Sequence, residues 1–139
     1  MNTNTPRGLR LNNPLCIRHS LQVFQGELYD RYPKPDPDFK AFRQLKYGYR
    51  AAFAILRTYI IKYNTSTLND IVRRWCPDAT ADDYVKAVSR QTGFDPSHKF
   101  CFARPDEIKC LVAAMAFVET GVPANLEALN EGFELLSAI

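Results

Sequence analysis

The sequence predicts a single, mainly α-helical domain of the α+β class, with a small β or extended element near its N-terminus. Its 139 residues are 46% hydrophobic and 24% charged, which suits one domain, residues 1–139, with a continuous buried core. From residue 46 onward, apolar residues recur every three or four positions, as they do on the buried face of a helix. Capping residues and glycines divide this region into separate helices.

The first 45 residues lack that periodicity. We interpret residues 1–10 as a flexible polar tail and the proline-rich residues 32–37 as an exposed loop. Between them, residues 15–29 mix β-favouring side chains with Gly26. One or two short strands or extended segments are therefore expected there, and residues 39–42 can form another.

Two short helices are predicted from threonines that precede an aspartate by three positions. Thr67 with Asp70, and Thr80 with Asp83, have the spacing at which a threonine side chain caps the first turn of a helix. They follow a longer helix over residues 46–64.

Glycine, proline and asparagine mark the boundaries of the later helices. Gly93 ends the helix that follows Thr80, because glycine readily adopts the left-handed conformation of a helix end. Pro105 suits the first turn of the next helix, residues 105–120, and Gly121 its end. Asn125 can cap the last helix.

Glu119 is the candidate catalytic residue. It continues the apolar stripe formed by Ile108, Val112 and Met115, at the negative C-terminal end of the helix dipole. Burial and the dipole both disfavour a carboxylate and should raise its pKa, which is the property of a general acid near neutral pH. The alternative is an ordinary helix-end glutamate that reaches solvent or an arginine.

Several classes of site are absent from the sequence. The four cysteines form no C-x-x-C pair, and His19 and His98 are isolated, so we expect reduced, mostly buried thiols, no metal site and no cofactor. No P-loop, dinucleotide-binding glycine run or nucleophile elbow is present. The cysteines are Cys16, Cys76, Cys101 and Cys110.

The sequence also lacks membrane and secretion signals. No stretch reaches the length of about 18 to 20 apolar residues that a membrane span needs. The N-terminal MNTNTPRGLR has no apolar signal core, so synthesis in the cytoplasm without a signal peptide is expected. The net charge of +3 permits contact with anionic polymers without favouring one.

Residues 6–18 read PRGLRLNNPLCIR. This segment resembles the opening of a family of phage and prophage virion structural proteins whose typical start is RGIRNNNPGNIR. Elements in residues 23–26, 39–77, 82–96 and 114–121 match further elements of that family in the same order. The resemblance covers about residues 6–121 and implies a chain that is virion-associated or exported by other machinery.

The same segments are similar, in permuted order, to lysozyme-like glucosaminidases and lytic transglycosylases of the flagellar type. In those enzymes a helix ending in E-S-G precedes N-N-L-F-G-I-K, whereas here N-N-P-L-C-I-R comes first and E-T-G last. The resemblance implies a lysozyme-like domain with a circularly permuted chain. If the chain is permuted, the Glu119 carboxyl group should be joined to residues 12–18 by one hydrogen bond, either directly or through a water.

The resemblance also implies roles for individual residues. Glu119 would protonate the glycosidic oxygen between N-acetylmuramic acid and N-acetylglucosamine, as a peptidoglycan glycosidase or lytic transglycosylase does. Asn12 and Asn13 could bind acetamido or hydroxyl groups, or instead close the turn before Pro14. Tyr84 could stabilise the positively charged transition state, or be a half-buried core phenol.

The chain also departs from the family pattern. Phe24 stands where the family has the tryptophan of its sugar platform, and Leu15 and Cys16 replace a glycine and an asparagine. No second catalytic acid is obvious, which fits enzymes that use the N-acetyl group of the substrate instead.

Two other functions remain open. A catalytically inactive virion structural or interaction protein would use exposed aromatics, Tyr29, Tyr32 and Tyr47, to bind other virion or mobile-element proteins. A nucleic-acid-binding domain is less favoured, since 15 acidic residues nearly balance 18 basic ones. The basic residues that it would use are Arg43, Lys46, Arg50, Arg57, Arg73 and Arg74.

Overall fold

The computed structural model describes residues 5–137 of the protein. Over these residues the fold is mainly α, which confirms the predicted class. The helices are α1 (Arg7–Arg10), α2 (Leu45–Lys62), α3 (Leu68–Trp75), α4 (Ala81–Thr92), α5 (Pro105–Thr120) and α6 (Leu126–Ser137). No helix is long and apolar enough to cross a membrane, within the residues described.

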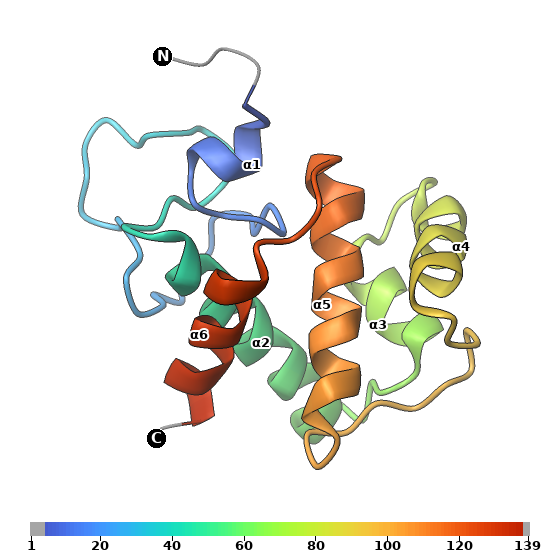
Figure 1. Ribbon diagram of the computed structural model, residues 1–139. Helices are drawn as coiled ribbons and strands as arrows, with labels where there is room; N and C mark the ends of the chain where they lie inside the picture. The colour runs from blue at the N-terminus through green and yellow to red at the C-terminus, as the bar shows by residue number, and fades with distance from the viewer. Residues whose placement is uncertain (1–4, 138–139) are drawn as a thin grey trace.

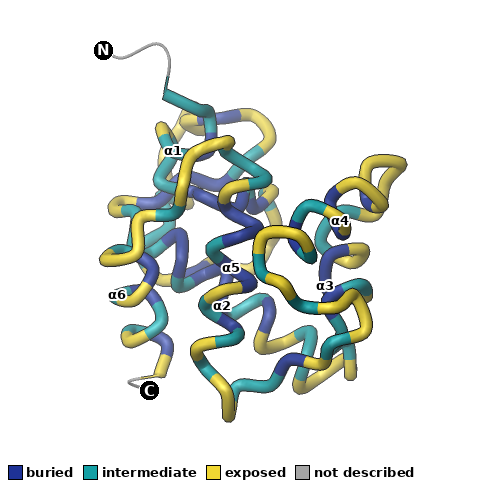
Figure 2. Tube along the Cα trace, turned by 45° about the vertical axis from the view of Figure 1, so that its right-hand side comes forward, coloured by how far each residue is buried: buried dark blue, intermediate teal, exposed yellow. Residues whose placement is uncertain are grey.

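Helix α5 lies in the middle of the molecule, between α2 and α6 on one side and α3 and α4 on the other (Figure 1). Leu111, Val112 and Met115 on this helix are fully buried, as the width of its apolar stripe predicts. Buried positions run through the centre of the molecule, whereas exposed positions gather in the loops and on the outer helix faces (Figure 2).

The helix boundaries follow the local signals with one exception. The Thr67 side chain accepts a hydrogen bond from the Asp70 amide at 3.1 Å, so the predicted cap of α3 is confirmed. Gly93 and Gly121 adopt the left-handed conformation at the ends of α4 and α5, with φ angles of 78° and 73°. The prediction for Thr80 was wrong, because its side chain does not cap α4.

The N-terminal element contains no regular strand in the part of the chain that the structure describes. Its extended segments meet only at isolated bridges, Arg18 with Phe39 and Glu27 with Phe42. The expected β element is therefore reduced to paired extended backbone. Backbone hydrogen bonds at these bridges, such as that from the Lys40 amide to the Ile17 carbonyl oxygen at 2.9 Å, join the segments together with buried polar side chains.

The Asn13 side chain is the first of these polar groups. Its amide nitrogen donates to the carbonyl oxygens of Ile17 at 2.9 Å and of Lys40 at 2.8 Å, and its oxygen accepts from the Ile17 amide at 2.8 Å. Asn13 is fully buried, so these bonds replace the water it loses on folding. The amide thus joins the segment around residue 15 to the segment around residue 40.

The Lys40 ammonium is the second buried polar group of the N-terminal element. It is fully buried and lies 3.0 Å from both carboxylate oxygens of Glu27. It also donates to the carbonyl oxygens of Gln22 at 2.9 Å and Ser20 at 3.3 Å. Since a buried charge is tolerated only when it is paired and hydrogen-bonded, these contacts fix the course of residues 20–27.

The predicted polar tail is shorter than residues 1–10. Residues 7–10 form α1, and the Arg7 guanidinium binds both oxygens of Asp36 at 2.6 and 2.7 Å. This bidentate contact also ties the otherwise exposed proline-rich loop to α1, because Asp36 is buried. Residues 1–4 of the predicted tail lie outside the described residues.

Helix α2 approaches the N-terminal segment closely at Gly48. A Cβ atom at this position would overlap the Asn12 carbonyl oxygen and lie 2.7 Å from Pro14 Cδ. Glycine therefore allows α2 to pack directly against the backbone of residues 12–14.

Replacing Lys40 by methionine should lower the free energy of unfolding by about 3 to 5 kcal/mol, because Glu27 would keep a buried charge without its partner. Urea denaturation at neutral pH measures this loss. The control is Lys46→Met, which removes an ion pair with Glu131 of 3.8 Å that is partly open to solvent. We expect that control to lose less than about 1 kcal/mol. Equal losses in the two variants would contradict a structural role for the buried pair.

Candidate functional site

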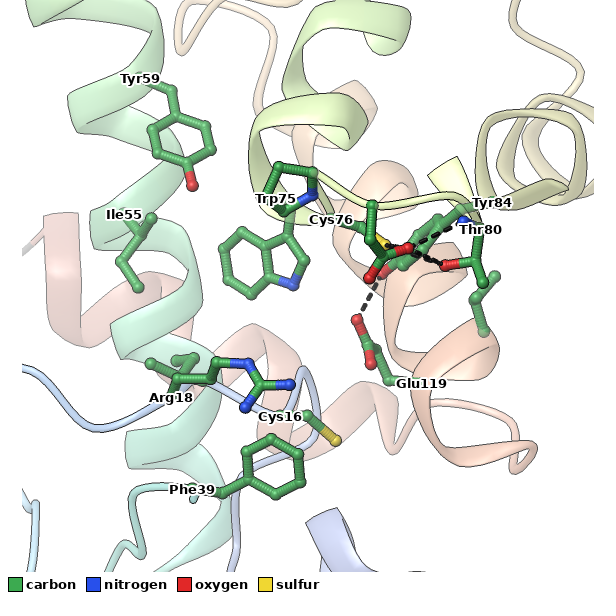
Figure 3. Close-up of a pocket in the computed structure, with 14 residues that line it drawn as sticks. Cys16, Arg18, Phe39, Ile55, Tyr59, Trp75, Cys76, Thr80, Tyr84 and Glu119 are labelled. Atoms are coloured by element: carbon green, nitrogen blue, oxygen red, sulfur yellow. Dashed lines mark hydrogen bonds between the residues drawn. The ribbon is translucent and has the colours of Figure 1, made fainter. Parts of the chain in front are cut away.

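An open pocket with a volume of about 490 Å³ lies where the C-terminal end of α5 meets the N-terminal segment. Its walls come from residues 16–18, Phe39, α2, the end of α3 with the loop that follows it, α4 and α5 (Figure 3). Stretches that are distant in sequence therefore form one concave surface. Concave surfaces of this size, with apolar walls and a few converging polar groups, are typical of ligand sites.

Glu119 projects into this pocket from the last turn of α5. The Tyr84 hydroxyl on α4 donates a hydrogen bond to Glu119 Oε2 at 2.9 Å and lies 3.4 Å from the Met115 carbonyl oxygen. The tyrosine therefore ties α4 to α5 and fixes the orientation of the carboxyl group. Tyr84 is itself buried, so it is both a core residue and a partner of Glu119.

Burial raises the pKa of the Glu119 carboxyl group, in the direction that its place on the apolar stripe predicts. The Tyr84 hydroxyl, the Trp75 indole, the Arg18 charge and the Cys16 thiol act against this shift, because each of them favours the ionised form. The pKa nevertheless remains above its ordinary value. Such a carboxyl group holds its proton closer to neutral pH, as a general acid requires.

Segment 12–18 reaches Glu119, but through Cys16 and Arg18 rather than through the two asparagines. Burial beside Glu119 raises the pKa of the Cys16 thiol to about 11, so this cysteine stays protonated. Arg18 is exposed, with its guanidinium 5.3 Å from the centre of the Phe39 ring, and it makes no ion pair with any described residue. A close salt bridge, which would keep Glu119 ionised, is therefore not formed by Arg18.

Asn12, Asn13 and Phe24 do not line the pocket. The Asn12 side chain donates to the Phe42 carbonyl oxygen at 3.0 Å, and Asn13 uses its amide within the buried N-terminal element. Phe24 is buried, with its ring 5.6 Å from the Lys40 ammonium. Both asparagine side chains thus bind backbone groups of distant segments, whereas the alternative to sugar binding in the sequence analysis was to close the turn before Pro14.

The pocket contains two kinds of side chain that the sequence analysis missed. Trp75, the last residue of α3, lines the pocket, and Tyr59 packs against it edge to face at 6.3 Å between ring centres. Asp78, in the α3–α4 loop, brings a second carboxylate to the same pocket. The one local signal for Asp78 was its place two residues before Thr80, where an aspartate commonly closes a turn.

The cysteines are free thiols, but the expectation that most are buried was wrong. Cys16, Cys76 and Cys101 are half-buried and Cys110 is exposed. Within residues 5–137, no group of three or more histidine, cysteine, aspartate or glutamate side chains is placed to hold a metal ion.

No protein-family model matches the chain. The chain is similar to a curated protein, Protein P5 of Pseudoalteromonas phage PM2, with 32% identity over 134 residues. The aligned region covers 92% of this chain and 80% of that protein.

Replacing Tyr84 by phenylalanine should raise the pKa of Glu119 further, because the hydroxyl that favours the carboxylate is lost. Carbon-13 NMR titration of labelled glutamate carboxyl groups measures this shift. The loss of one hydrogen bond should lower stability by about 1 kcal/mol. Tyr59→Phe is the control, since Tyr59 lines the pocket but makes no hydrogen bond to Glu119. A lowered or unchanged Glu119 pKa in Tyr84→Phe would show that the Tyr84 hydroxyl does not favour the ionised form of Glu119.

Proposed function

Because the chain belongs to the same protein family as Protein P5 of Pseudoalteromonas phage PM2, and is thus a phage-associated protein, we propose that it cleaves the glycan strand of peptidoglycan, with Glu119 as the general acid. The observation that carries the proposal is the half-buried Glu119 carboxyl group, held by Tyr84 at the wall of an open pocket. The activity would be that of a lysozyme-like glycosidase or lytic transglycosylase.

The acid step requires a protonated carboxyl group next to the glycosidic oxygen. Burial favours the protonated form of the Glu119 carboxyl group, because it raises the pKa of that group. In the reaction, Glu119 transfers this proton to the oxygen between N-acetylmuramic acid and N-acetylglucosamine, and the C1–O bond breaks. The Tyr84 hydroxyl then stabilises the carboxylate that remains, through the bond it already donates to Oε2.

Aromatic side chains support the choice of a sugar polymer as substrate. Phe39, Tyr59 and Trp75 all line the pocket, and their rings offer apolar faces on which the C–H faces of sugar rings can lie. The polar groups between them, from Arg18, Asp78 and Glu119, can fix the orientation of a sugar.

The Arg18 guanidinium favours peptidoglycan over an uncharged glycan. It is exposed in the pocket and makes no ion pair with the described residues. It also extends between the Phe39 and Trp75 rings in the view of Figure 3. The stem peptides of peptidoglycan carry free carboxylates, and a guanidinium binds a carboxylate through two parallel hydrogen bonds.

An inactive virion structural or interaction protein is the second candidate. Large apolar side chains in the 20–37 loop are exposed to solvent, which is typical of a surface that binds another protein. They are Leu21, Val23, Tyr29 and Tyr32. Nucleic-acid binding gains less support, because Arg73 is paired with Asp82 at 2.6 Å and Arg74 stacks on Tyr63 at 4.2 Å.

Replacing Glu119 by glutamine should reduce muropeptide release from purified peptidoglycan by about 100-fold to 10,000-fold, because the variant keeps the shape and loses the proton. Chromatography of the released fragments measures the rate. Glu127→Gln, an exposed glutamate on α6, is the control and should keep full activity. Equal rates in wild type and Glu119→Gln would exclude Glu119 from the mechanism. No activity in the wild type would favour the interaction protein.

The stability of Glu119→Gln shows whether the variant is folded. Since the folded-state pKa of Glu119 is raised, its contribution to stability is complete below the pKa of the unfolded chain, which is about 4.5. It is lost as the pH rises through the folded pKa. Glutamine does not ionise, so we expect a melting temperature at neutral pH that is no lower than that of the wild type.

Replacing Arg18 by glutamine should weaken binding of an acidic muropeptide by about 10-fold, since a charged hydrogen bond contributes about 1.5 to 3 kcal/mol. Binding of uncharged chitotetraose should not change. Calorimetry in the Glu119→Gln background separates binding from turnover. Arg10→Gln, an exposed arginine outside the pocket, is the control. Similar losses for both ligands would assign Arg18 a structural role instead of charge recognition.

A further inference from the structure

The pocket that contains Glu119 has a second carboxyl group, that of Asp78. Asp78 lies in the loop between α3 and α4, whereas Glu119 ends α5, so the two acids enter the pocket from different elements. Arg18 acts electrostatically on both, because its charge lowers the pKa of each. The two carboxyl groups therefore belong to one electrostatic environment.

One oxygen of Asp78 is held and the other is free. Oδ1 accepts hydrogen bonds from the Thr80 amide at 2.8 Å, the Thr80 hydroxyl at 2.6 Å and the Cys76 thiol at 3.5 Å. Oδ2 makes no hydrogen bond with any residue that the structure describes. The loop thus fixes the orientation of the carboxylate and leaves one oxygen available to a ligand or a water.

Asp95 shows what the turn by itself requires. Its Oδ1 accepts from the Ser97 amide at 2.8 Å and the Ser97 hydroxyl at 2.6 Å, which are the distances found at Asp78 and Thr80. Asp95 does not line the pocket. The two aspartates share a local structure and differ in what lies beside them, so Asp95 is a matched control for any role of Asp78 beyond the turn.

We infer, on the basis of the glycosidase function proposed above, that Asp78 is the second catalytic carboxylate, which takes up the proton of the hydrolytic water. A lone pair of the water oxygen forms the new bond to sugar C1, and one water proton goes to Asp78 Oδ2. The C1–O bond breaks, and its electron pair stays on the leaving oxygen, which receives the Glu119 proton. Solvent then takes the proton from Asp78 and returns one to Glu119.

The environments of the two acids fit this division of work. Hydrogen bonds from Thr80 lower the pKa of Asp78, which keeps it ionised and able to accept a proton. Burial raises the pKa of Glu119, which keeps it able to donate one. The Asp78 side chain is exposed, so water reaches it directly.

The acid step is compatible with hydrolysis and with lytic transglycosylation, and a catalytic base at Asp78 predicts hydrolysis. A lytic transglycosylase needs no water, because a hydroxyl group of the muramyl residue attacks C1 and leaves an anhydro end. With Asp78 as base, the product has a reducing end whose new oxygen comes from water. Mass spectrometry of fragments made by the wild-type protein in oxygen-18 water should therefore show one heavy oxygen per cleavage and no anhydro ends.

Variants of Asp78 and Asp95 distinguish a catalytic role of Asp78 from its structural role in the turn. Asp78→Asn keeps an oxygen acceptor for Thr80 and cannot take up a proton, so we expect the rate to fall about 100-fold to 10,000-fold. Asp95→Asn should keep the wild-type rate, and thermal unfolding should shift equally in the two variants. Azide, a nucleophile that needs no base, should restore turnover of Asp78→Ala and give a glycosyl azide, which a purely structural role would not produce.

The outcomes distinguish this inference from the function on which it rests. An inactive wild-type protein overturns both. An active wild type that depends on Glu119 but is as fast as its Asp78→Asn variant overturns the role of Asp78 alone, and leaves the N-acetyl group of the substrate as the second participant. Anhydro ends on the wild-type products also overturn it, and this readout does not depend on whether any variant folds.

Discussion

The buried ammonium of Lys40 is the group on which the N-terminal third of the protein depends. This region has no regular strand within the described residues, so separate backbone hydrogen bonds at isolated bridges, and not a continuous ladder, join its segments. Lys40 instead binds Glu27 through its side chain, while its backbone amide donates to the Ile17 carbonyl oxygen at 2.9 Å and its carbonyl accepts from Asn13. Arg18 follows Ile17 and Phe39 precedes Lys40, so the contacts of Lys40 place these two residues opposite each other. Both residues line the pocket and form one of its walls.

The opposite wall depends on the packing of α4 against α5. One hydrogen bond, from Tyr84 to Glu119, joins the two helices at the point where a carboxyl group enters a partly apolar surrounding. A carboxylate there is unfavourable for stability at neutral pH, since burial opposes its ionisation. Proteins retain such groups mainly where their chemistry is used, which is the physical reason for assigning a function to this pocket instead of to the other concave surfaces.

The proposal of a glycan as the substrate rests on the side chains that meet in the pocket. The pocket combines aromatic rings, an arginine without an ion pair among the described residues and two carboxyl groups whose pKa values move in opposite directions. Each of these features alone is common on protein surfaces. Their convergence in one open site, from elements as distant in sequence as Arg18 and Glu119, is the observation behind the proposed glycan cleavage.

The sequence by itself determined the helices of residues 45–137 and the position of Glu119 on the apolar face of α5, because periodicity, the Thr67 cap and the glycine ends are local properties of the chain. Only the tertiary structure decided which residues surround that glutamate. The Asn13 amide is buried between the backbones of Ile17 and Lys40, and Asp78 acquires its proposed role only from what lies across the pocket. Extended segments without periodicity carry no local signal of their partners, so the composition of the site follows from packing between distant segments.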